Sequence, residues 1–126
     1  MLLPVSQVAS LVDSLNLTWL DKVYLNEIPN EDLDNIDNTV MLLQETDSTP
    51  SNYANGTFKG ISAGVEMQIF YKANLDDGFN PLEAEINLMQ SLKSAGWLIV
   101  SSQHHTTDPV TDQVTKTIYV TKDNLI

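Results

Sequence analysis

The stretch Gly-Val-Glu-Met-Gln-Ile-Phe-Tyr-Lys, residues 64–72, decides the fold class because apolar and polar side chains alternate along most of it. Successive side chains of a β-strand point to opposite faces. One face would therefore be apolar and the other polar: Val65, Met67, Ile69 and Tyr71 against Glu66, Gln68 and Lys72. We predict a half-exposed strand. Phe70 stands on the polar side, where its exposure would mark a contact surface.

Upstream of this strand, apolar runs alternate with polar connections. Residues 39–45 form a short apolar run, which is typical of a strand covered on both faces. A shorter strand is expected at 22–25, followed by a solvated acidic loop at 30–38. Residues 46–60 are rich in Thr, Ser and Asn and include an Asn-Gly pair at 55–56. We expect them to form a long, polar and mobile loop.

Two helices are expected. Residues 81–95 carry apolar side chains at helical spacing. The preceding Asn-Pro-Leu-Glu stretch, residues 80–83, supplies an N-cap, a proline for the first helical position and a capping glutamate. Gly96 is suited to end this helix in the left-handed conformation. Residues 4–15 show a second amphipathic pattern, which opens on proline.

The C-terminal part is predicted to form a β-hairpin, with strands over 97–105 and 113–122. Its second strand places apolar side chains on one face, opposite a row rich in threonine: Val114, Ile118 and Val120. We therefore predict a single α+β domain over residues 1–126. Its architecture would be a mainly antiparallel, four-stranded sheet with two helices packed on one face.

Composition argues against several classes of function. The chain carries 17 Asp and Glu residues against six Lys and Arg together, and its net charge is −11. Nucleic-acid binding is disfavoured because phosphate recognition needs clustered basic residues, and acidic membranes are disfavoured for the same reason. There is no cysteine, hence no disulfide or thiol chemistry. Neither a signal peptide nor a membrane span is evident in the sequence, so a soluble intracellular protein is expected.

The two histidines of the chain, His104 and His105, are adjacent. Adjacent strand residues point to opposite faces, so this pair would not chelate one metal as a local unit. We interpret both as surface residues beside a strand end, where either could titrate near neutral pH. The sequence contains no phosphate-binding glycine loop, nucleophile elbow or dinucleotide fingerprint. We therefore expect no catalytic residues and no cofactor.

Two acidic clusters invite a metal-binding hypothesis. They are Asp76, Asp77, Glu83 and Glu85 near the second helix, and Asp32, Asp34 and Asp37 in the first loop. The former fails the register of a calcium-binding loop, because Ala73 would occupy the first ligand position. We interpret it as a turn followed by carboxylates favoured at a helix N-terminus. The latter is interpreted as a flexible acidic loop, and no metal site is predicted.

A family resemblance rests on short stretches along the chain: LPVSQV at 3–8, WLDKV at 19–23, IP at 28–29, MQIFYK at 67–72 and AGW at 95–97. They resemble a family of short uncharacterised tail-region proteins of siphophages and prophages of lactic-acid bacteria. The element order is also similar to that of phage tail-terminator and head-tail joining proteins. The resemblance implies a hexameric ring that caps the tail tube, and it implies no catalytic residues.

The expected function is therefore structural, as a ring-forming tail-completion or head-tail joining protein of a virion assembled in the bacterial cytoplasm. The expected partners are further copies of the chain and phage tail-tube or neck proteins. Aromatic anchors between subunits would come from Phe70, Tyr119, Tyr53 and Phe58. Phe70 and Tyr119 could instead lie under the helices.

A second class of function stays open, namely a small acidic monomeric adaptor or inhibitor that binds a basic protein. An enzyme is the third reading and would require a deep pocket with convergent polar groups.

Overall fold

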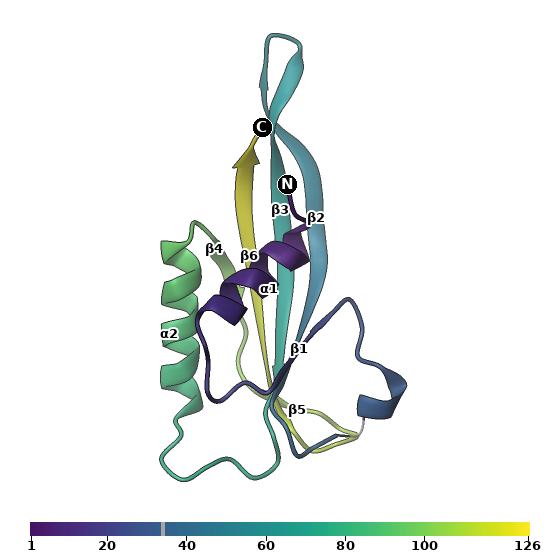
Figure 1. Cartoon of the computed structure of the whole chain (residues 1–126), viewed down its shortest axis with the longest axis vertical. Coiled ribbons are helices and arrows are strands. Elements are labelled where there is room, and N and C mark those ends of the chain that lie inside the picture. The colour runs from purple at the N-terminus through teal and green to yellow at the C-terminus, as the bar shows by residue number, and fades with distance from the viewer. Residues whose placement is uncertain (34) are drawn as a thin grey trace.

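The computed structural model describes residues 1–33 and 35–126. Two helices and a mixed β-sheet make up an elongated α+β molecule (Figure 1). In chain order the elements are α1 (Pro4–Ser14), β1 (Lys22–Leu25), the short 3₁₀ turn η1 (Asn30–Asp32), β2 (Val40–Ala54), β3 (Thr57–Phe70), α2 (Pro81–Ser94), β4 (Leu98–Ser102), β5 (Thr106–Thr107) and β6 (Val114–Leu125). The α+β class and both helices expected from the sequence are confirmed.

The described residues form a sheet of six strands, which corrects the expected four. Its order is β1-β2-β3-β6-β4, and β5 pairs with the N-terminal end of β6. β1 runs parallel to β2, whereas the other pairs are antiparallel. The strand expected at 22–25 is confirmed, but its direction was not predictable, because a periodic pattern of apolar residues carries no information about strand polarity.

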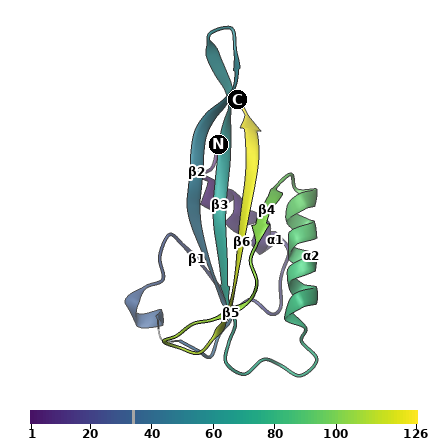
Figure 2. The ribbon, with the colours of Figure 1, turned by 180° about the vertical axis from the view of Figure 1, so that it is seen from behind.

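The core lies between the helices and one face of the sheet. Every second residue of β3 from Ala63 to Ile69 faces it, as the alternation at 64–72 predicts, and Val65, Met67 and Ile69 have no exposed surface. The helices contribute their apolar stripes: Val5, Val8 and Val12 from α1, and Leu88 and Leu92 from α2. Figure 2, the view from behind, shows the sheet in front of α1. We call the face away from the helices the open face.

Both ends of α2 are capped by the residues that the sequence predicts. The Asn80 side chain accepts a hydrogen bond from the backbone N–H of Glu83 at 3.3 Å. After the last turn, Gly96 adopts a φ of +97°, and the Trp97 N–H donates to the Leu92 carbonyl at 2.9 Å. This bond reaches back over the end of the helix, as in a Schellman stop. It places the indole of Trp97 in the core, where 2% of the residue is exposed.

Residues 46–60, expected as a loop, instead continue β2 and β3 as a hairpin. The ladder runs to the pair Ala54 and Thr57, and the two-residue turn between them has positive φ at Asn55 (51°) and Gly56 (78°). Asn-Gly is the preferred sequence for this tight hairpin turn. The polar composition therefore reflects a solvent-exposed hairpin and not an irregular connection.

The end of this hairpin projects from the molecule. β6 accompanies β3 only as far as the pair Gly60 and Leu125. From this pair outward, residues 51–60 form a two-stranded extension, which we call the arm. In both views the arm extends beyond β6 and the helices (Figures 1 and 2). Four residues per strand at about 3.3 Å each give an arm of roughly 13 Å.

Candidate functional site

The arm carries an exposed aromatic pair. Tyr53 and Phe58 are directly opposite each other in the ladder, so their side chains share one face. Their ring centroids are 6.3 Å apart in an edge-to-face arrangement, which is favourable for aromatic pairs. Tyr53 is 72% exposed and Phe58 36%. The pair therefore leaves much of its surface in solvent, although aromatic side chains are among those enriched at protein interfaces.

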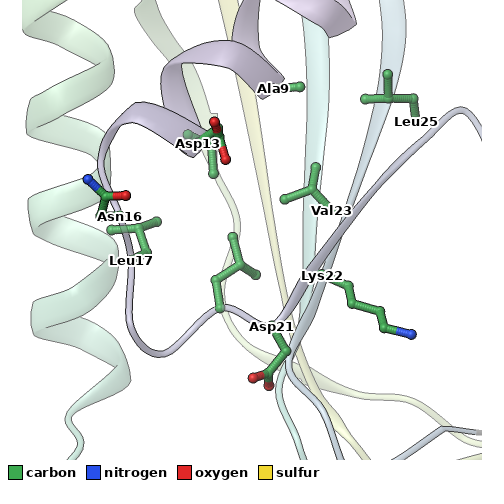
Figure 3. Close-up of a pocket in the computed structure, with 10 residues that line it drawn as sticks. Ala9, Asp13, Asn16, Leu17, Asp21, Lys22, Val23 and Leu25 are labelled. Carbon is green, nitrogen blue, oxygen red and sulfur yellow. The ribbon is translucent and has the colours of Figure 1, made fainter.

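A groove lies between α1 and β1 (Figure 3). We call it the α1–β1 groove, and its volume is about 450 Å³. Apolar side chains from both elements and from the segment between them line much of it: Ala9, Val12, Leu17, Leu20, Val23 and Leu25. Polar residues complete the lining: Asp13, Asn16, Asp21 and Lys22. Figure 3 shows Val23 directed toward α1, while the Lys22 ammonium extends away from the helix.

Two features make the α1–β1 groove suited to a protein segment. β1 pairs with β2 on one side, and no strand of the described residues pairs with its other edge. An unpaired strand edge offers backbone donors and acceptors to an added strand. Acidic groups outnumber basic ones at the rim, since Asp13, Asp21 and Lys22 are all exposed. The Asp21 carboxylate already accepts a hydrogen bond from the Thr39 N–H at 2.8 Å.

A second groove, of about 400 Å³, lies on the open face beneath the segment that follows β1. Phe70 helps to line it and is half-buried there, beside Ile28, Leu33, Val40 and Leu42. Asp32 also lines it and accepts a hydrogen bond from the Tyr24 hydroxyl at 2.7 Å. That bond raises the pKa of Tyr24. Of the acidic cluster expected in this loop, Asp37 is exposed and Asp34 lies outside the described residues.

Phe70 and Tyr119 both lie on the open face, so the alternative that they lie under the helices is wrong. Their neighbours along each strand, Ile69 and Ile118, face the helix side and are fully buried, and alternation places the two aromatics opposite. Tyr119 pairs across the sheet with Glu66, whose negative charge raises the pKa of the Tyr119 phenol. Tyr119 is half-buried.

Three ionisable side chains meet on the helix side of the sheet. The Tyr71 hydroxyl donates a hydrogen bond to Glu85 Oε2, and His105 Nε2 lies 2.8 Å from the same oxygen. Glu85 has no exposed surface, and its Oε1 has no hydrogen-bond partner. Burial, followed by the bond to Glu85, raises the pKa of Tyr71 well above its usual range. Neither groove described above is lined by any of the three.

This cluster corrects one sequence interpretation, because Glu85 is a buried residue and not a solvated carboxylate at a helix start. His105 is a surface residue as expected, with 37% of its side chain exposed, and it also contacts Glu85 of α2. The burial of Glu85 could have been predicted from its spacing to Leu88 and Leu92, because this spacing places Glu85 on the apolar stripe of α2. His104 is exposed. The arrangement joins the segment before β5 to α2 through the buried carboxyl group of Glu85.

Among the described residues, no group of three or more His, Asp or Glu side chains is arranged to hold a metal ion. In the same part of the chain, no helix is both long and apolar enough to cross a membrane.

The fold and these surfaces define a class of protein: a helix-backed mixed sheet with a projecting two-stranded arm and a groove of mixed polar and apolar lining beside an edge strand. The chain belongs to the family described as "Protein of unknown function (DUF806)", whose model matches residues 2–125. No curated protein matches the chain.

Proposed function

We propose that this protein is a structural subunit of a phage or prophage tail, which completes the tail or joins it to the head by forming a ring. It carries out no catalysis in this proposal. The observation that carries it is the arm, which leaves the folded body and exposes an aromatic pair. A segment that adds little to its own core and displays interface-type side chains is suited to contact another protein.

The sequence resemblance to tail-region proteins supplies the biological setting of this proposal. A fold alone does not fix a function, so the setting rests on the quoted stretches and the surfaces support it. The −11 net charge of the chain also suits a ring through which DNA passes. An acidic lumen would repel the phosphate backbone and prevent DNA from adhering in transit.

Self-association is the direct test of this function. We expect multi-angle light scattering to show a mass several times that of the 14.0 kDa chain, either alone at high concentration or on addition of the cognate tail-tube protein. Negative-stain electron microscopy of the same sample should show closed rings. A chain that remains monomeric at all concentrations and does not bind the tube protein would overturn the proposal.

The charge imbalance favours a second candidate function, a monomeric adaptor or inhibitor of a basic protein. Such binding would depend steeply on ionic strength, because exposed charge pairs are screened within about 8 Å at physiological salt. Ring contacts built on aromatic and apolar side chains would depend on salt far less. Measuring the mass of any complex between 50 mM and 500 mM NaCl separates the two functions.

A further inference from the structure

We infer that the arm of one subunit docks into the α1–β1 groove of a second copy of this chain. The inference rests on the proposed ring function and names the contact that would close the ring. The arm and the groove are complementary in apolar surface, in charge and in backbone hydrogen bonding, and each kind of complementarity follows from described residues.

The apolar parts match in kind and in size. The face of the arm formed by Tyr53 and Phe58 is exposed on its own subunit. The α1–β1 groove is lined largely by aliphatic side chains and has a volume of about 450 Å³. Cavities of roughly 300–1,000 Å³ accommodate drug-sized groups, so this groove has room for side chains from the tip of a hairpin. Docking would remove apolar surface of both partners from water.

The charges of the two surfaces are opposite. Lys59 is the one charged residue of the arm, and all 17 carboxylates of the chain lie outside residues 51–60. The arm is therefore a cationic segment of a strongly acidic molecule. The groove carries exposed carboxylates at Asp13 and Asp21, which outnumber its one exposed ammonium at Lys22. The Lys22 ammonium extends away from α1 (Figure 3). Opposite charges at an interface fix the register of docking and favour this partner over a like-charged surface.

The backbones are also complementary. In the arm beyond the Gly60–Leu125 pair, β2 and β3 pair only with each other among the described residues, so each has an outer edge there. β1 has an unpaired edge beside the groove. Addition of an arm strand to β1 would satisfy both sets of backbone groups, as in other complexes formed by strand addition.

The geometry of this contact suits a ring. The arm and the α1–β1 groove are different surfaces of one subunit, so the contact is head-to-tail. It leaves an arm free at one end of the assembly and a groove free at the other. Contacts of this type close into rings when the rotation between subunits permits, and otherwise continue as filaments. A symmetric dimer would need the same patch on both subunits, which is not the arrangement inferred here.

Cysteine cross-linking tests the contact directly, because the chain has no cysteine of its own. Thr57→Cys places a thiol in the arm and Asp13→Cys places one at the groove; both positions are exposed. We expect an equimolar mixture of the two variants to form a disulfide-linked dimer under mild oxidation. The matched control replaces Asp13→Cys with Val110→Cys, at a position that is 82% exposed and is not among the residues that line the groove. Equal cross-linking of both mixtures would overturn the inference.

Substitutions in the arm provide the second test. Tyr53→Ser with Phe58→Ser should weaken self-association at least about ten-fold, as expected for loss of central aromatic anchors. Lys59→Glu should weaken it less, and Asp13→Lys in the same chain should restore part of the loss, since the opposite charges would then be exchanged between copies. Concentration-dependent light scattering measures all three. If Asp13→Lys does not restore the self-association that Lys59→Glu weakens, the arm and the groove are not held together by opposite charges at these two positions.

The outcomes separate this inference from the ring function itself. Assembly that persists when the arm is changed, without arm-to-groove cross-links, overturns the docking mode and leaves the ring in place. Loss of tube-protein binding with unchanged self-association assigns the arm to a different partner and also overturns the inference. Absence of any assembly by the unmodified chain, alone or with the tube protein, overturns both.

Discussion

The two ends of the β2–β3 hairpin share one ladder but lie in opposite environments. Near the helices, Met41 pairs with Ile69 and Leu43 with Met67, and all four side chains are fully buried. In the arm, Tyr53 pairs with Phe58 and both are exposed. A two-stranded hairpin in water is marginally stable at best. Helix cover, and not backbone pairing, therefore concentrates the folding free energy in the helix-covered part of the molecule, which we call the body, and leaves the arm available for contact.

The largest effect should come from removing a side chain at the covered end. Ile69→Ala should lower the free energy of unfolding by about 2–5 kcal/mol, because it removes buried methyl groups and leaves a cavity. Phe58→Ala, the matched change in the arm, should alter it by no more than about 0.5 kcal/mol. Urea denaturation followed by circular dichroism measures both. Similar losses in the free energy of unfolding at the two positions would show that the arm contributes to folding as much as the helix-covered end does.

Loss of the buried hydroxyl of Tyr71 should have the next largest effect. Tyr71→Phe removes the hydroxyl that donates to Glu85 Oε2, so that only the His105 ring nitrogen still contacts this oxygen. Weakening the hydrogen bonding of a buried carboxyl group costs about 1–3 kcal/mol. Tyr119→Phe serves as the control, since this phenol is on the open face and only half-buried. Thermal unfolding of both variants at neutral pH measures the difference. A Tyr71→Phe variant as stable as the control would show that the cluster adds nothing to the body.

The same variant predicts a change in pH dependence. The folded state raises the pKa of Tyr71 above its ordinary value of 10. A phenol with a raised folded-state pKa contributes its full stabilisation below about pH 10 and loses it as the pH rises toward the folded-state value. We expect the free energy of unfolding to fall above pH 10, and to fall less steeply for Tyr71→Phe. Urea titrations between pH 8 and 11 test this, and equal slopes would contradict it.

A third comparison uses two glycines with positive φ. Gly96 ends α2 at +97°, and Gly56 lies in the arm turn at +78°. An alanine in a left-handed conformation costs roughly 1–2 kcal/mol. We expect Gly96→Ala to lower global stability by about that amount, as its Cβ would also lie 3.3 Å from the Lys122 side chain.

Gly56→Ala should leave global stability nearly unchanged, because the arm can open locally without unfolding the body. Hydrogen exchange should detect its effect instead, as faster exchange of amides confined to residues 51–60. Faster exchange throughout the sheet would mean that arm and body unfold as one unit.

The smallest effect on stability should come from removing the arm altogether. Pro50 and Ile61 are cross-strand partners, so an Asn-Gly turn in place of residues 51–60 keeps the register of the remaining ladder. The free energy of unfolding should change by less than about 0.5 kcal/mol, although the hydrogen bond from the Ile126 N–H to the Lys59 carbonyl is lost. Urea denaturation and light scattering on one sample would show a stable chain that no longer assembles.

Much of the body was predictable from local sequence. The helix bounds follow from caps and apolar spacing, and the face of β3 follows from alternation, because these signals lie within a few residues of one another. The arm was missed because polar composition was given more weight than the Asn-Gly turn signal at 55–56. The parallel direction of β1 depends on pairing with a distant strand, and short patterns do not encode it.

The candidate site was predictable only in part. The sequence singled out Tyr53, Phe58, Phe70 and Tyr119 as interface aromatics, and the structure places the first two on the arm and the others on the open face. The α1–β1 groove forms between segments whose relative position is set by the sheet, and no pattern of residue spacing in the sequence predicts it. The burial of Glu85 was indicated by its place on the apolar stripe of α2.

The position of β3 between β2 and β6 also bears on how the chain folds during synthesis. Its partner in β2 is joined to it by a two-residue turn, whereas its partners in β6 lie roughly 45 to 65 residues further along. At about 5–20 residues per second, a ribosome needs several seconds to supply them. Throughout that interval one side of the central strand is without its neighbour. A nascent chain of this protein therefore emerges with unpaired backbone groups along one edge of β3, which could pair with another chain. A chaperone or rapid helix docking must protect this edge until β6 has been synthesised.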